Sequence, residues 1–196
     1  MKIALSTTIV CILIGYPAAY FIAKMDEKSQ AFAILLITLP MWINMLIRTY
    51  SWQGILANFN VSSQFKVLVG MVYNFLPFMI IQIYTSLSKI DQNLLTAAND
   101  LGASDVQTFL RVTLPLSIPG VISGITLVFL PAVSSFFIPK LLGGGEFVLI
   151  GNLIESYFIS VGDWNFGSAI SVVMAIAIIA SMFITKKMDK QIGGEE

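Results

Sequence analysis

Long stretches of apolar residues, each about as long as a lipid bilayer is thick, constrain this chain more than any other feature. A helix that spans the bilayer needs about 20 mostly apolar residues. Five stretches meet that need: Ile3–Ala23, Ala31–Ala57, Phe65–Leu87, Ile118–Ile138 and Phe166–Thr185. Hydrophobic residues make up 57% of the 196 and charged residues 11%, far from the composition of soluble domains. The sequence therefore predicts an all-α membrane protein with five transmembrane helices.

Glycine and proline inside these stretches predict bends rather than ends. Gly15 and Pro17 lie in the first stretch, and Pro77 lies in the third. Neighbouring helices can satisfy the backbone groups that proline frees in lipid. The first stretch is longer than the apolar core of a signal peptide, and no small-residue cleavage site follows it. We therefore expect it to be a membrane span.

Several classes of chemistry are excluded by residue types that are scarce. The chain has no histidine, which rules out histidine-ligated haem, histidine-containing zinc sites and a Ser-His-Asp triad. Its single cysteine, Cys11, lies in an apolar stretch and cannot form an internal disulfide. The formal net charge is zero, so no basic footprint points to nucleic acid. We expect neither catalytic residues nor a metal site on this chain.

The distribution of lysine and arginine predicts the orientation. Two connections, 24–30 and 88–117, and the segment after Thr185 share seven basic residues: Lys24, Lys28, Lys89, Arg111, Lys186, Lys187 and Lys190. The opposite side has three: Lys2, Lys66 and Lys140. Because cytoplasmic loops are enriched in such residues, the carboxyl terminus is expected in the cytoplasm and the loop 140–165 outside. Five spans then leave Met1 outside, so we expect an earlier span to precede this chain.

The connection between the third and fourth stretches predicts a helical hairpin. Asp91 can cap a helix that ends at Leu101, with Gly102 as the residue that stops it. Ser104 and Gln107 have the spacing of a capping box that begins a second helix. We expect Leu114-Pro115 to end that second helix before the next span. Apolar residues cover both helices, so the hairpin should dock on the underside of its own bundle or on another protein.

A family resemblance rests on this hairpin. The run Thr96-Ala97-Ala98-Asn99-Asp100-Leu101-Gly102, then nine residues, then Val112-Thr113-Leu114-Pro115 resembles the EAA motif, EAA-x3-G-x9-I-x-LP, of type I ABC importer membrane subunits. Thr96 replaces the glutamate of the motif and Val112 replaces its isoleucine. Asp100, one helical turn after Thr96, could supply the missing carboxylate.

The resemblance implies that this hairpin couples the chain to an ABC ATPase dimer, which would bind ATP and Mg. The implied coupling residues are Thr96, Ala97, Ala98, Asp100, Gly102, Val112, Leu114 and Pro115. The runs 39–52, 137–145 and 149–152 are similar to spermidine/putrescine permeases, which usually have six spans, and the match begins at their second span. The implied type-1 transmembrane domain covers residues 1–187, with the coupling loop at about 88–117 and a cytoplasmic tail at 188–196. Implied partners are a second homologous permease subunit, an extracytoplasmic binding protein and membrane lipid, in a bacterial plasma (inner) membrane.

Four residues are candidates for the substrate pathway. Arg48 is costly inside a membrane, but it could equally anchor its span by reaching the interface. Trp52 could stack on an amine or belong to an interfacial aromatic belt. Glu155 and Asp163 lie in the acidic external loop, where carboxylates would attract a polycation. Glu155 is the stronger candidate because apolar residues surround it, whereas Glu146 is read as an ordinary solvated residue.

Other functions remain open. Gly143-Gly144-Gly145 lacks the lysine and serine or threonine of a phosphate-binding loop, so we read it as a flexible turn. The chain could be a permease subunit for polyamines, a permease subunit for another small solute, or a membrane scaffold without transport activity. An ion-coupled transporter is disfavoured, because the predicted spans contain almost no ionisable residues besides Arg48.

Overall fold

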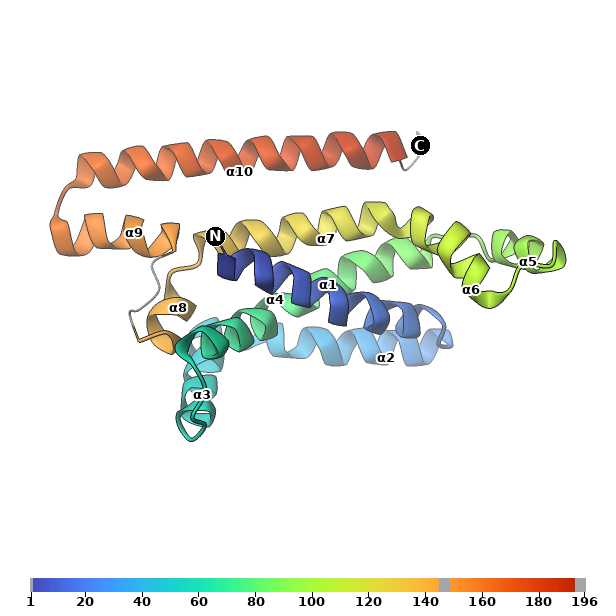
Figure 1. Cartoon of the computed structure of the whole chain (residues 1–196), viewed down its shortest axis with the longest axis horizontal. Coiled ribbons are helices and arrows are strands. Elements are labelled where there is room, and N and C mark those ends of the chain that lie inside the picture. Colours follow the sequence, from blue (N-terminus) through green and yellow to red (C-terminus); the bar gives the residue numbers. More distant parts are fainter. Residues whose placement is uncertain (1, 145–148, 193–196) are drawn as a thin grey trace.

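The computed structural model describes residues 2–144 and 149–192, and all of its regular elements are helical, as the sequence predicted (Figure 1). The long helices are α1 (Lys2–Ala23), α4 (Ser63–Ser88), α7 (Leu114–Ser134) and α10 (Trp164–Ile192). The shorter helices are α2 (Glu27–Thr38), α3 (Met45–Ala57), α5 (Gln92–Asp100), α6 (Asp105–Thr108), α8 (Phe137–Leu142) and α9 (Ile150–Ser156). A 3₁₀ turn, η1 (Leu39–Trp42), and two π-helical turns, η2 (Phe109–Thr113) and η3 (Tyr157–Val161), join some of them.

Within the described ranges, three uninterrupted helical stretches are long and apolar enough to cross a membrane. They are α1, α4 and the continuous run from Asp105 to Ser134. The predicted stretch 31–57 is not one straight helix, because α2 with η1 meets α3 at 91°. Pro40 lies in η1 and Asn44 caps α3, so the sequence itself interrupts this segment. Counted as one broken span, the pair raises the number to four.

The fifth predicted stretch, 166–185, lies within α10. The apolar part of α10 among the described residues, Trp164–Ala180, is shorter than the three uninterrupted spans. Pro17 and Pro77 lie inside unbroken helices, as expected of proline in a packed membrane bundle.

Helix α4 is the centre of the bundle, with α1 and α7 packed against it. Most of the fully buried side chains that join these helices are apolar, among them Cys11 of α1, Met71 and Met79 of α4, and Val128 of α7. The outward faces are also apolar, since Leu13, for example, is 68% exposed. A bundle that is apolar both inside and outside suits a lipid environment.

The turn between α1 and α2 is tied to α4 by polar side chains. Asp26 caps α2 by accepting a hydrogen bond from the Ser29 amide, and hydrogen bonds from Ser29 lower the pKa of this carboxyl. The Gln30 amide group donates to the carbonyls of Ala23 (3.2 Å) and Met25 (2.8 Å). Tyr84 of α4 donates to Gln30 Oε1 at 2.8 Å. One glutamine therefore holds the turn against the central helix.

Segments that the charge pattern assigned to one side of the membrane lie at one end of the molecule. The α1–α2 turn and the α5–α6 hairpin are at the right in Figure 1, and α10 runs back toward that end. Helices α3, α8 and α9 lie at the opposite end. The two groups of connections therefore lie at opposite ends of the molecule. Which of the two ends lies in the cytoplasm remains a prediction from the charge pattern.

Candidate functional site

The hairpin of α5 and α6 projects from one end of the bundle (Figure 1). Asp91 caps α5 by accepting from the Asn93 amide at 2.9 Å, as predicted. Helix α5 ends at Asp100, one residue before the predicted Leu101. Ser104 and Gln107 form the predicted capping box at the start of α6, with bonds of 3.4 and 3.0 Å.

Gly102 makes the turn between the two helices. Its φ of +83° is in the left-handed region that glycine adopts at little cost. The Gly102 amide donates to the Asn99 carbonyl (2.9 Å) and the Ala103 amide donates to the Ala98 carbonyl (3.1 Å). This pair of bonds is a Schellman motif, which satisfies the last carbonyls of α5. Thr108 of α6 donates to Asn99 Oδ1 at 3.0 Å and fastens the two helices together.

The second helix does not end at Leu114-Pro115, so this prediction was wrong. The helix continues from α6 through η2 into α7, and the Leu114 amide donates to the Phe109 carbonyl, five residues earlier. Proline has no amide hydrogen and would clash with the carbonyl four residues before it in a regular helix. The wider π turn before Pro115 accommodates the ring, so the helix continues past the proline.

The hairpin keeps much of its apolar surface in the open. Helix α5 has no buried residue, and the side chains of four apolar residues are at least half exposed: Leu94 (50%), Leu101 (89%), Val106 (66%) and Leu110 (54%). Among the described residues, the underside of the bundle therefore does not cover them.

The residues of the EAA-like motif are distributed along this hairpin. Thr96 is exposed and donates its hydroxyl hydrogen to the Gln92 carbonyl at 3.1 Å. Ala97 is exposed and Ala98 is partly buried, while Asp100 is the exposed last residue of α5. Val112, Leu114 and Pro115 lie at the base, in η2 and the first turn of α7.

An aromatic cluster that the sequence analysis did not identify connects the hairpin base to α1. The Phe109 ring packs edge-on against Tyr20 (5.2 Å between ring centroids) and Tyr16 (6.0 Å). The Tyr16 hydroxyl shares a 2.7 Å hydrogen bond with Ser117 of α7. The spacing of Tyr16 and Tyr20, one helical turn apart, was the available signal. Through these contacts the base of the hairpin is joined directly to α1 and α7.

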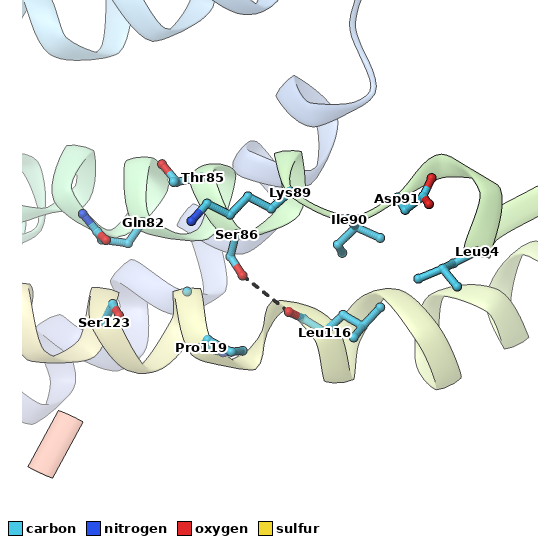
Figure 2. A pocket seen from close by; sticks show the side chains of 11 residues that line it. Gln82, Thr85, Ser86, Lys89, Ile90, Asp91, Leu94, Leu116, Pro119 and Ser123 are labelled. Carbon is cyan, nitrogen blue, oxygen red and sulfur yellow. Dashed lines mark hydrogen bonds between the residues drawn. The ribbon is translucent and has the colours of Figure 1, made fainter. Parts of the chain in front are cut away.

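A cleft of about 480 Å³, lined by both polar and apolar residues, lies beside the hairpin, between the end of α4 and the start of α7. It was also missed by the sequence analysis, since its residues come from segments about 30 positions apart. Figure 2 shows Lys89 running back along α4 and Ser86 donating a hydrogen bond to the Leu116 carbonyl (3.4 Å). The remaining polar lining residues include Gln82, Thr85, Asp91 and Ser123.

Two of the pathway candidates meet at Tyr73 of α4. Arg48 is partly buried, and its Cζ lies 6.0 Å from the centre of the Tyr73 ring. Two of its nitrogens, Nε and Nη1, are buried without a hydrogen-bond partner among the described residues. Trp52 packs edge-on against the same ring at 5.3 Å. Trp52 therefore has a packing role of its own, on the ring of Tyr73 that Arg48 also faces.

The two acidic candidates have different surroundings. Glu155 of α9 forms an ion pair with Lys140 of α8, with 2.5 Å between Nζ and Oε1, and its side chain is 18% exposed. Asp163 is exposed and accepts a hydrogen bond from the Phe166 amide at 3.0 Å, so it caps the start of α10. Glu146 lies outside the described residues. The structure thus distinguishes Glu155, which is half-buried and paired with a lysine, from Asp163, which is exposed and caps a helix.

Comparison with known proteins gives a consistent result. The sequence matches the family described as "Binding-protein-dependent transport system inner membrane component" over residues 11–192. It is 38% identical over 196 residues to the spermidine/putrescine transport system permease protein PotB of Escherichia coli K12, covering 91% of this chain and 71% of PotB. The identity to the protein of the same name in Haemophilus influenzae is 39%, covering 93% and 70% of the two chains.

The fold has relatives of known structure. A chain from the inward-facing MetNI methionine ABC transporter superposes with a TM-score of 0.74 at 15% identity, covering 97% of this chain and 91% of that one. At this level of identity the likeness concerns the fold alone.

Proposed function

The chain belongs to the family of binding-protein-dependent transport system inner membrane components and is a permease subunit of an ABC importer, and we propose that it imports polyamines such as spermidine and putrescine. The observation that carries the substrate proposal is the identity of 38–39% to spermidine/putrescine permeases along nine-tenths of this chain. The half-buried carboxylate of Glu155 and the aromatic ring of Trp52 are groups whose chemistry suits an aliphatic polycation.

The exposed hairpin is proposed to be the contact with the ATPase. Its open apolar side chains, such as Leu101 and Val106, need a protein surface to cover them. The coupling residues are those of the EAA-like motif: Thr96, Ala97, Ala98, Asp100, Gly102, Val112, Leu114 and Pro115. The aromatic cluster of Tyr16, Tyr20 and Phe109 gives a rigid route for motion from the hairpin into the spans.

The assembly proposed around this chain has the parts that such an importer needs. Two ATPases that bind ATP and Mg would dock on the hairpins of this chain and of a second homologous permease subunit. An extracytoplasmic binding protein would deliver substrate at the end that carries α8 and α9. In this arrangement residues 1–187 form the transmembrane domain, the carboxyl terminus is cytoplasmic, and the complex lies in the inner membrane.

Transport then follows from two states with different affinity for substrate. Closure of the ATPases would draw the hairpins together and tilt the spans from an inward-facing to an outward-facing arrangement. Substrate would enter past Arg48, Trp52, Glu155 and Asp163. It would leave beside the cleft between α4 and α7, where hydroxyl and amide groups can replace water around an ammonium group.

An uptake measurement tests this proposal. The complete importer is reconstituted in vesicles with ATP inside, and uptake of radiolabelled spermidine is measured against unlabelled putrescine, amino acids and sugars. We expect ATP-dependent uptake that polyamines alone compete away. Uptake of another solute class with no polyamine transport would reject the substrate proposal, and absence of any ATP-dependent uptake would reject the importer role.

A further inference from the structure

The ion pair between Lys140 and Glu155 has an asymmetric setting. The Glu155 side chain is 18% exposed, whereas that of Lys140 is 61% exposed, so the carboxylate is held by the protein and the lysine reaches it from the solvent side. The two residues lie on separate short helices, α8 and α9. Between the described residues this is the one ion pair within 4.0 Å. A carboxylate in this position needs a cation, since a half-buried charge without a partner is costly.

The chemistry of the partner is informative. A lysine side chain is an aliphatic stem that ends in an ammonium group, which is an aminobutyl group attached to the backbone. Putrescine and spermidine carry the same aminobutyl group at one end. The side chain that occupies Glu155 therefore has the structure of the end of the proposed substrate.

We propose that Lys140 is a built-in competitor that occupies Glu155 when no substrate is bound, and that an aliphatic polyamine enters by displacing it. This inference rests on the proposed function, because it assigns the element that sets the affinity of that same pathway for amines. Lys140 is thus a specificity-determining residue, and Glu155 is the group that receives the substrate ammonium.

Such an exchange has a physical advantage for a transporter. When one ammonium replaces another, Glu155 is never left unpaired, so the empty and loaded states have similar electrostatic energies. Binding is then weak enough for the substrate to be released after the change of state, which transport requires. The exposed stem of Lys140 can swing into solvent, where its ammonium regains its hydration.

The alternative is that the ion pair merely fastens α8 to α9. Other contacts already hold this region together, because the Asn152 amide group donates to the Phe136 carbonyl at 2.7 Å and the Gln53 amide group to the Leu141 carbonyl at 3.4 Å. A fastening role predicts that loss of Lys140 weakens transport. A competitor role predicts the opposite.

The test is a series of variants at Lys140 in the complete importer, with the initial rate of spermidine uptake measured over a range of concentrations. Lys140→Met keeps the aliphatic stem without the charge and should lower KM roughly fivefold, the scale of one partly exposed ion pair. Lys140→Arg should raise KM, since a guanidinium can bind a carboxylate through two hydrogen bonds. Lys66→Met, which removes another lysine predicted to be external, should leave KM unchanged.

A double variant identifies the group through which Lys140 acts. In a Glu155→Gln background, Lys140→Met should no longer lower KM, because the contested carboxylate is gone. An unchanged or higher KM for Lys140→Met, or an equal effect of Lys66→Met, would overturn the inference. If Lys140→Met fails to assemble, Lys140→Arg decides, and an unchanged KM for it counts against the inference. Wild-type importer that takes up no polyamine would instead reject the proposed function.

Discussion

At the scale of single residues, Glu155 and Arg48, two charged groups at the end that carries α3, α8 and α9, are compensated differently. Glu155 has a lysine at hydrogen-bonding distance, whereas Arg48 faces the ring of Tyr73 and leaves two nitrogens without partners in the described structure. An aromatic ring attracts a guanidinium, but by less than a carboxylate does. Arg48 is therefore the group with bonding capacity left to use in the assembled importer.

Replacement of Glu155 by glutamine keeps the size of the side chain and removes its charge. A hydrogen bond to a charged group contributes about 1.5–3 kcal/mol, and displacement of Lys140 offsets about a fivefold share of this effect on KM, so Glu155→Gln should raise the KM for spermidine by about twofold or more. Assembly of the complex should be unchanged, because Asn152 and Gln53 still hold the region.

The measurement is spermidine uptake at low and saturating concentration, with ATPase co-purification as the assembly check. Glu27→Gln is the matched control, because Glu27 is exposed in the first turn of α2 at the opposite end of the molecule. Equal uptake by Glu155→Gln and wild type at low substrate would remove Glu155 from the pathway.

At the scale of elements, the hairpin depends on one backbone conformation. Gly102 has a φ of +83°, and a side chain added there would meet no atom within 4 Å. The penalty for a larger residue is therefore conformational and not steric crowding. It amounts to about 1–2 kcal/mol for a residue with a Cβ atom, and more for a β-branched one.

We expect Gly102→Val to distort the hairpin while the spans still insert, since they fold in lipid through their own apolar residues. ATPase retention on purified membranes and uptake in vesicles should both fall steeply. Gly102→Asn is the control, because asparagine tolerates the left-handed region better than other residues with a Cβ atom. Retention and uptake close to wild type for Gly102→Val would contradict the coupling role of the hairpin.

Where α4 and α7 cross, Gly120 is needed for close packing and not for its backbone conformation. A Cβ atom on Gly120 would lie 2.7 Å from the Gln82 carbonyl oxygen and 2.4 Å from Ser86 Cβ. Backbone atoms cannot move aside as a flexible side chain can, so Gly120→Ala should destabilise the bundle by about 1–3 kcal/mol. Gly54→Ala is the matched control, since nothing lies within 4 Å of its added Cβ.

Thermal unfolding of the purified complex in detergent measures both glycine variants. We expect a clearly lower Tm for Gly120→Ala and an equal or higher Tm for Gly54→Ala, because alanine favours a helix over glycine. Equal melting temperatures for the two variants would mean that α4 and α7 can separate at little cost.

At the scale of the whole molecule, the two ends differ in their lysine and arginine content, and this difference predicts how the chain is oriented in the membrane. In a Cys11→Ala background, an impermeant thiol reagent should label Asn60→Cys from outside intact cells. Lys28→Cys should react only after permeabilisation, because positively charged connections stay in the cytoplasm. Both positions are exposed in the described structure, so accessibility alone cannot explain a difference. Labelling of Lys28→Cys in intact cells would reverse the orientation.

The sequence by itself determined the all-α membrane class, the resemblance to ABC importer permeases, and the caps and glycine turn of the hairpin. These features depend on residues that are close together in the chain. Apolar length decides whether a segment belongs in lipid, and a capping residue acts within three or four positions. For that reason the roles of Asp91, Gly102, Ser104 and Gln107 follow from their spacing along the chain, and the structure confirms them.

Only the tertiary structure decided what the helices do to one another. It showed that the angle between α2 and α3 is 91°, that the helix continues through Pro115, and that Lys140 pairs with Glu155. These features depend on how backbone strain is relieved and on which distant groups meet. Composition and short-range spacing do not encode either of these. A carboxylate that the sequence suggested was open to substrate proved to have a lysine already in place, because packing of α8 against the bundle brought the two charges together.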